Sequence, residues 1–153
     1  MAASNTTLTK IQTWFIPECI SPSLSGSDED SIRELACILE KSGKVTDCSQ
    51  VIQDILIREK TAEPFILNSI FIPHALSKGV SDFCAAAGIH KDADSLHIII
   101  MVVWPENSRS NLKKIAALIR SLSKANILEG LKNAEDSKGI SDYLNSLLPA
   151  DAI

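Results

Sequence analysis

The sequence has few aromatic side chains, no strong charge of either sign and no long hydrophobic run. Aromatic residues make up 5% of its 153 residues, so its core must be mostly aliphatic. The formal net charge of -4 at pH 7 argues against a nucleic-acid-binding surface. The longest uncharged apolar stretch, residues 96–104, is far shorter than the ~20 residues that a membrane-spanning helix requires. These absences favour one globular domain with no nucleic-acid partner and no membrane insertion.

The motifs of common cofactor sites are also absent. The four cysteines form no CxxC pair, and no group of histidine, cysteine and aspartate has zinc-like spacing, so we expect no metal. There is no P-loop, no dinucleotide-binding glycine fingerprint and no GxSxG elbow, so we expect no ATP, no NAD and no other cofactor. No basic segment followed by an apolar run opens the chain, which predicts a cytoplasmic protein with reduced thiols.

Helical patterns alternate with turn signals along much of the chain. A first helix is capped by Ser27 with Asp30 and closed by Gly43. A second helix begins after Thr46-Asp47 and ends near residues 58–60. Apolar periodicity predicts three further helices, one after residues 105–108, one at 127–131 and one from about 136 to Pro149. Residues 1–10 are polar, and we expect them to be frayed.

The remaining segments have the pattern of strands. Residues 11–24 contain two prolines and are expected to form an extended edge segment, while residues 80–89 fit a strand or a helix. Residues 65–72 are predicted to form one strand that ends at Pro73, which leaves His74 at its tip. The β-branched run at 96–104 is typical of a strand buried on both faces. Helices must then cover both faces, so we predict an α/β fold with a mixed sheet sandwiched between helices, as a single domain over residues 1–153.

Three histidines are candidates for chemistry. His97 lies in the most apolar strand, where a histidine more often has a structural role, with its hydrogen bonds made within the fold. His90 is predicted to lie in a polar turn, where a solvated imidazole is ordinary. His74 combines a rigid flank with expected exposure, and a neutral imidazole is a competent nucleophile. His74 is therefore the leading candidate.

The order of these motifs resembles the enzyme IIA domain of the bacterial phosphotransferase system. Arg58-Glu59-Lys60 is followed by Ile70-Phe-Ile-Pro-His74-Ala75, then by a buried strand ending at Trp104-Pro105, then by Asn111-Leu112 at the start of a long amphipathic helix. The similarity is to the fructose/mannitol type, and especially to its nitrogen-regulatory branch. It covers nearly the whole chain.

The resemblance implies a phosphoryl acceptor and its neighbours. The position that matches the family's phosphorylated histidine is His74, which would receive the group from a phosphohistidine protein of the HPr type. Arg58 matches the family's arginine near that histidine and would stabilise the phosphate. Asn68 agrees with the family's loop, and Asn111 stands where many members have a second histidine, so both are candidate binding residues.

The sequence departs from the family pattern before the histidine. Residues 62–69 replace a loop of Ser-Thr-Gly and further glycines, with Glu63-Pro64 at the Ser-Thr position. The segment from His74 to the buried strand is also shorter than usual. Two functions remain open: a phosphocarrier that serves a sugar permease or a regulatory target, or a degenerate module that regulates partners by binding alone. Because the chain carries no fused permease segment, a stand-alone regulatory version is favoured.

Overall fold

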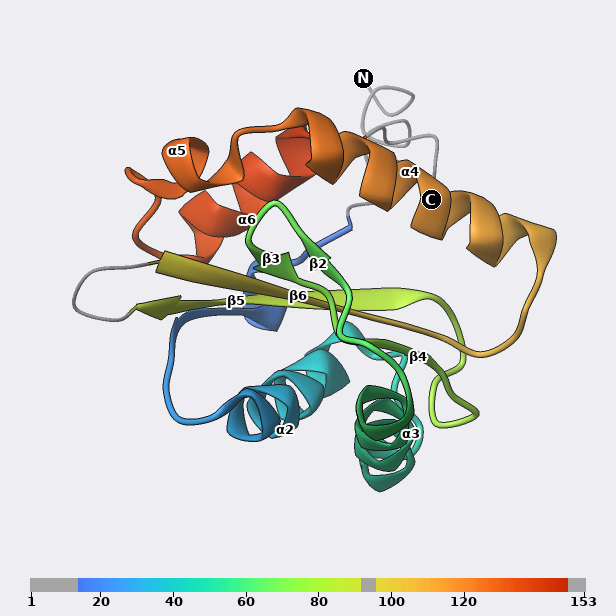
Figure 1. The fold of residues 1–153 in the computed structure, drawn as a ribbon. Coiled ribbons are helices and arrows are strands. Elements are labelled where there is room, and N and C mark those ends of the chain that lie inside the picture. Colours follow the sequence, from blue (N-terminus) through green and yellow to red (C-terminus); the bar gives the residue numbers. More distant parts are fainter. Residues whose placement is uncertain (1–13, 92–95, 149–153) are drawn as a thin grey trace, which may run out of the picture.

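The computed structural model describes residues 14–91 and 96–148, which form one β-sheet with helices on both faces (Figure 1). One face carries α4 (Arg109–Lys124), α5 (Ile127–Leu131) and α6 (Ser137–Ser146), and the other carries α2 (Asp28–Leu39) and α3 (Cys48–Thr61). Short 3-10 turns, η1 (Pro17–Cys19) and η2 (Glu40–Ser42), precede the first strand and follow α2. The expectations for residues 1–10 and for Pro149 fall outside the described residues.

Six strands in the described residues form a single mixed sheet. They are β1 (Ile20–Leu24), β2 (Ile66–Leu67), β3 (Ile70–Phe71), β4 (His74–Leu76), β5 (Cys84–Lys91) and β6 (Leu96–Trp104). The order is β1-β5-β6-β3-β2, with β4 also paired to β6. β5 and β6 are antiparallel, whereas β1 runs parallel to β5, and both β3 and β4 run parallel to β6. The predicted mixed sheet between helices is confirmed.

Local capping explains where the helices begin. Ser27 and Asp30 form the predicted capping box at α2, with each side chain accepting a hydrogen bond from the other residue's backbone N–H. Asp47 caps α3 and Ser108 caps α4 through a single bond each, in which the side-chain oxygen accepts from the backbone N–H three residues on. After η2, Gly43 has a φ of 78°, the left-handed conformation that glycine adopts most easily. These ends were correctly predicted because each depends on residues within one helical turn.

The core is divided between the two faces of the sheet. Along β6, alternate residues belong to different hydrophobic clusters, as the two-residue period of a strand requires. One set packs toward α4, α5 and α6, and the other toward α2 and α3. The first set is Ile98, Ile100, Val102 and Trp104, and the second is Ile99, Met101 and Val103. The prediction that this strand is buried on both faces is confirmed.

The prediction of a single strand at residues 65–72 is wrong. The segment folds as a hairpin of β2 and β3, with Asn68 and Ser69 between them at φ values of 50° and 69°. Two successive residues with positive φ are typical of a type I′ turn, whose twist matches that of the paired strands. His74 is consequently not the tip of this strand but the first residue of β4.

One other histidine assignment also needs correction. His90 lies in β5 rather than in a polar turn, directly opposite His97 of β6. The Nε2 atom of His90 is 3.1 Å from the carbonyl oxygen of Gly26. His97 is exposed although its strand is buried further along, because it lies near the start of β6, ahead of the buried run. The ambiguous residues 80–89 contribute to β5, so the strand alternative was correct.

Candidate functional site

His74 begins a short strand that is held to the centre of the sheet. The strand pairs His74 with Val102 of β6 in a parallel register, and the backbone N–H of Val102 donates to the carbonyl of Pro73 at 3.1 Å. Pro73 is buried, while the His74 side chain is partly exposed. The backbone on both sides of the imidazole is therefore fixed, and the ring still has access to the surface.

The orientation of the imidazole follows from three contacts. Its Nδ1 lies 2.8 Å from the carbonyl oxygen of Ile72, which can only accept a hydrogen bond. A neutral ring with this contact carries its proton on Nδ1, so the lone pair is on Nε2. The indole of Trp104 stacks on the ring with centroids 6.0 Å apart and planes at 9°, and Phe65 meets it edge-on at 5.9 Å. These contacts fix the plane of the ring and leave the lone pair of Nε2 available.

A cavity of about 240 Å³ lies beside His74, between the sheet and α4. Its wall is apolar apart from the imidazole. Leu112, which is 51% exposed, belongs to the outer part of that wall. The lining residues are Phe65, Ile72, His74, Val102, Trp104, Leu112, Ile115, Leu118 and Ile119. Such a wall excludes water from one side of the ring and offers space for an apolar group.

Arg58 lies on α3, which packs on the other face of the sheet. Its Nη1 donates to the Glu59 carboxylate at 2.9 Å and to the backbone carbonyl of Glu63 at 3.1 Å. Both bonds use the same nitrogen, whereas a guanidinium has five N–H donors. Among the contacts of the described residues, none joins Arg58 to His74. The two are connected through the segment from Glu63 to Phe65, which contacts Arg58 at one end and the imidazole at the other.

The two asparagines lie near opposite ends of α4: Asn111 is in its first turn, and Asn68, in the β2–β3 turn, contacts Ser123 in its last turn. Asn68 is exposed in the hairpin turn, and its amide donates to the carbonyl of Ser123 at 3.4 Å. Asn111 is only 5% exposed, and its amide donates to the carbonyl of Glu106 at 3.0 Å. Asn111 therefore holds the turn that leads from β6 into α4. A role for either side chain in binding phosphate stays a prediction.

Trp104 is the site residue that the sequence did not identify. It was recognised only as the end of a buried strand, because the stacking partner of His74 depends on the register of β4 against β6. Phe65, Phe71 and Leu76 are large apolar residues close to His74 in the sequence. The structure separates these residues: Phe71 packs toward α2 and α3, while Leu76 is 41% exposed.

No helix in the described part of the chain combines the length and the apolar character needed to cross a bilayer. Residues 14–147 match the protein family described as "Phosphoenolpyruvate-dependent sugar phosphotransferase system, EIIA 2". This match includes every residue of the candidate site, from Arg58 to Asn111.

Individual relatives agree with this family. The chain is 30% identical over 130 residues to the "PTS system fructose-specific EIIABC component" of Bacillus subtilis, covering 79% of this chain. The matched part of this chain corresponds to 20% of that relative's length. A solved structure, the nitrogen regulatory protein IIA-Ntr of Neisseria meningitidis, superposes with a TM-score of 0.71 at 20% identity, covering 86% of this chain and 96% of the other. At that identity the superposition supports the fold alone.

Proposed function

Because the chain belongs to the EIIA 2 family of the phosphoenolpyruvate-dependent sugar phosphotransferase system, we propose that it is a phosphocarrier whose acceptor is His74. The donor would be a phosphohistidine protein of the HPr type. The receiving partner would be a sugar permease component or a regulatory target in the cytoplasm. The observation that supports this proposal best is the 2.8 Å contact between His74 Nδ1 and the carbonyl of Ile72.

This contact supports Nε2 as the nitrogen that reacts. The Nε2 lone pair attacks the phosphorus of the donor phosphohistidine, and a new N–P bond forms as the donor's N–P bond breaks. The electron pair of the broken bond returns to the donor imidazole. The proton stays on Nδ1, where the carbonyl of Ile72 stabilises the positive charge that the phosphorylated ring acquires. Alignment and charge stabilisation supply most of the catalysis in phosphoryl transfer, and a pre-oriented ring provides the alignment.

Charge stabilisation would come from Arg58. Its bonds to Glu59 and Glu63 use one of its three nitrogens, so we propose that the guanidinium turns toward the phosphoryl group without leaving the segment that contacts His74. An arginine fork matches the spacing of phosphate oxygens. Asn68 and Asn111 are proposed to assist, Asn68 as an amide donor and Asn111 by holding the start of α4.

The proposal is tested by phosphorylation in vitro. The reduced protein is incubated with phosphoenolpyruvate and the two upstream carrier proteins, and its intact mass is measured before and after mild acid. We expect one acid-labile phosphoryl group on the wild type and none on His74→Ala. The matched control is His97→Ala, which removes an exposed histidine from β6 and should be modified like the wild type. If the wild type stays unmodified with an active donor in excess, the phosphocarrier proposal is wrong.

A second candidate is a module that regulates partners by binding, without phosphorylation. The observation that favours it is the apolar wall beside His74, to which Phe65 contributes from the segment that replaces the family's glycine-rich loop. Leu76 lies two residues after His74 on the same face of β4 and is exposed, as is Leu112 at the cavity. An unmodified wild type that still binds its partner, with affinity reduced in Leu112→Asp and unchanged in His74→Gln, would support this candidate instead.

A further inference from the structure

Two cysteines and a glutamate converge where α2 gives way to α3. Cys37 is in the last turn of α2, and Glu40 follows three residues later, so both lie on the same side of the helix. Cys48 is the first residue of α3. The turn at Gly43 reverses the chain between them, and their Sγ and carboxylate oxygen atoms all lie within 4.8 Å of one another. We propose that Cys37, Glu40 and Cys48 bind one Zn²⁺ ion, with water as the fourth ligand.

The geometry suits a tetrahedral metal. Zn–S distances of about 2.3 Å and Zn–O distances of about 2.0–2.2 Å place the ligand atoms of a tetrahedron roughly 3.3–3.8 Å apart. The three atoms need only a small inward movement from their present separation. Cys37 and Glu40 are exposed, so their side chains can rotate toward the ion and a water molecule can reach the open position.

The donor types select the metal. Two sulfurs exclude Mg²⁺ and Ca²⁺, which require oxygen ligands, whereas thiolate with carboxylate suits Zn²⁺. On binding, both S–H bonds break, two Zn–S bonds and one Zn–O bond form, and two protons pass to the buffer. No electron is transferred, so no oxidant is needed. The complex carries a net charge of -1 from two thiolates, one carboxylate and the dication.

The ion would link two helices that otherwise meet through side-chain packing. α2 and α3 contact each other below the sheet (Figure 1), and α3 carries Arg58 in its last turn. Fixing the first residue of α3 to the end of α2 restrains the helix that positions this arginine. Zn²⁺ bound only to the native state raises its stability by mass action. The site is separate from the phosphoryl chemistry at His74 and is tested without it.

The test uses the full chain, reduced and stripped of metal with a chelator, and titrated with Co²⁺ and then Zn²⁺. We expect one Co²⁺ per chain with thiolate-to-cobalt charge-transfer absorption, displaced by one equivalent of Zn²⁺. We also expect Zn²⁺ at about 100 times its Kd to raise the melting temperature by roughly 5–10 °C. Cys37→Ser and Glu40→Gln change exposed side chains, and each should weaken Zn²⁺ binding at least tenfold.

The matched control is Glu29→Gln, which removes an exposed carboxylate from the other end of α2 and should bind like the wild type. Absence of charge-transfer absorption would overturn the proposal, because it would mean that sulfur does not bind the ion. Equal Zn²⁺ affinity in Cys37→Ser and the wild type would overturn it as well. Circular dichroism of each variant distinguishes loss of binding from loss of fold.

Discussion

The Nδ1 atom of His74 lies 2.8 Å from the carbonyl oxygen of Ile72, the residue two positions before it in the chain. The intervening Pro73 has a restricted φ and no N–H, so the backbone between the two residues has little freedom. The contact thus comes from the local Ile-Pro-His sequence, and the pairing of β4 with β6 makes it rigid. This one relationship selects the reactive nitrogen of the proposed acceptor.

Trp104→Ala tests whether the stacked ring positions the imidazole. Trp104 is 8% exposed, so its loss should lower the free energy of unfolding by about 3–5 kcal/mol and slow phosphorylation of His74 by about tenfold or more. Trp104→Phe keeps an aromatic face and should recover most of the rate. Urea titration gives the stability, and single-turnover phosphorylation gives the rate. Equal phosphorylation rates in the folded fractions of all three proteins would contradict the positioning role.

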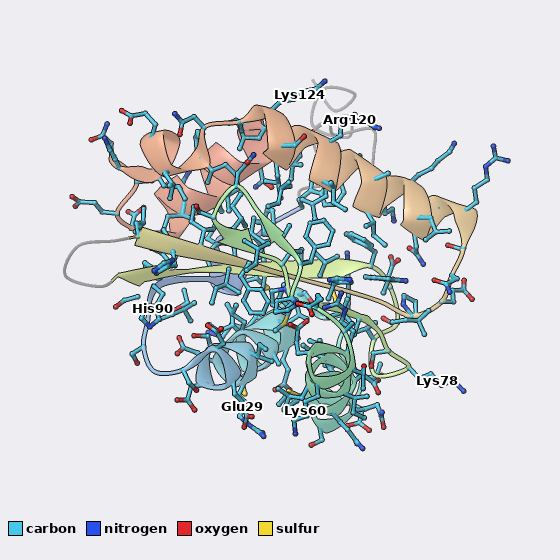
Figure 2. The ribbon with its side chains drawn as sticks, in the orientation of Figure 1. Glu29, Lys60, Lys78, His90, Arg120 and Lys124 are labelled. Atoms are coloured by element: carbon cyan, nitrogen blue, oxygen red, sulfur yellow. The ribbon has the colours of Figure 1, made fainter. Side chains whose placement is uncertain are left out.

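Arg58→Gln tests the proposed phosphate contact. We expect phosphorylation to slow by about 100-fold, because the dianion loses its guanidinium partner, while the free energy of unfolding changes by no more than about 1 kcal/mol. Lys60→Gln is the matched control. Lys60 is exposed near the end of the same helix, on the side away from the sheet (Figure 2), and its loss should leave the rate unchanged. Equal rates for Arg58→Gln and Lys60→Gln would remove Arg58 from the site.

Ser69→Gly tests the hairpin turn before the site. Ser69 has a φ of 69°, which costs a residue with a side chain about 1 kcal/mol or more relative to glycine. Asn-Gly is also the preferred pair for a type I′ turn. Ser69→Gly should therefore raise the free energy of unfolding by about 0.5–1 kcal/mol, and Ser69→Val should lower it by about 1–2 kcal/mol. Urea unfolding measures both changes. A Ser69→Gly variant less stable than the wild type would contradict the positive φ at this position.

The buried thiol of Cys84 makes stability depend on alkaline pH. Burial raises the pKa of this thiol from its ordinary 9.0 to about 12, so the native state keeps it protonated. The unfolded chain ionises the thiol above pH 9 and is then favoured. Below pH 9 the thiol is protonated in both states and does not lower the free energy of unfolding. Between pH 9 and pH 12 it should lower that free energy by about 1.4 kcal/mol per pH unit.

Urea unfolding at pH 8 and pH 10.5, under reducing conditions, measures this dependence. Cys84→Ala removes the thiol and retains the other groups that titrate in this range. The wild type should therefore lose about 2 kcal/mol more stability than Cys84→Ala between the two pH values. Identical losses in both proteins would show that the thiol does not contribute.

Much of the fold could be predicted because its signals are local. Ser27, Asp47 and Ser108 cap their helices through residues three positions away, and the apolar run at 96–104 is recognisable from its composition. The hairpin was missed because residues 65–67 and 70–72 read as one apolar segment, and Asn-Ser is a weaker turn signal than Asn-Gly. His90 was assigned to a turn because its neighbours are polar.

The sequence by itself determined the family, the helix boundaries and the choice of His74 as acceptor candidate. Only the tertiary structure decided which rings enclose His74, and that Arg58 contacts the segment that leads to Phe65. It also brought Cys37, Glu40 and Cys48 together, although their spacing matches no zinc motif. The physical reason is the range of the interactions: caps and periodicity act within a few residues. Stacking, cavities and ligand clusters depend on strand register and helix packing across the whole chain.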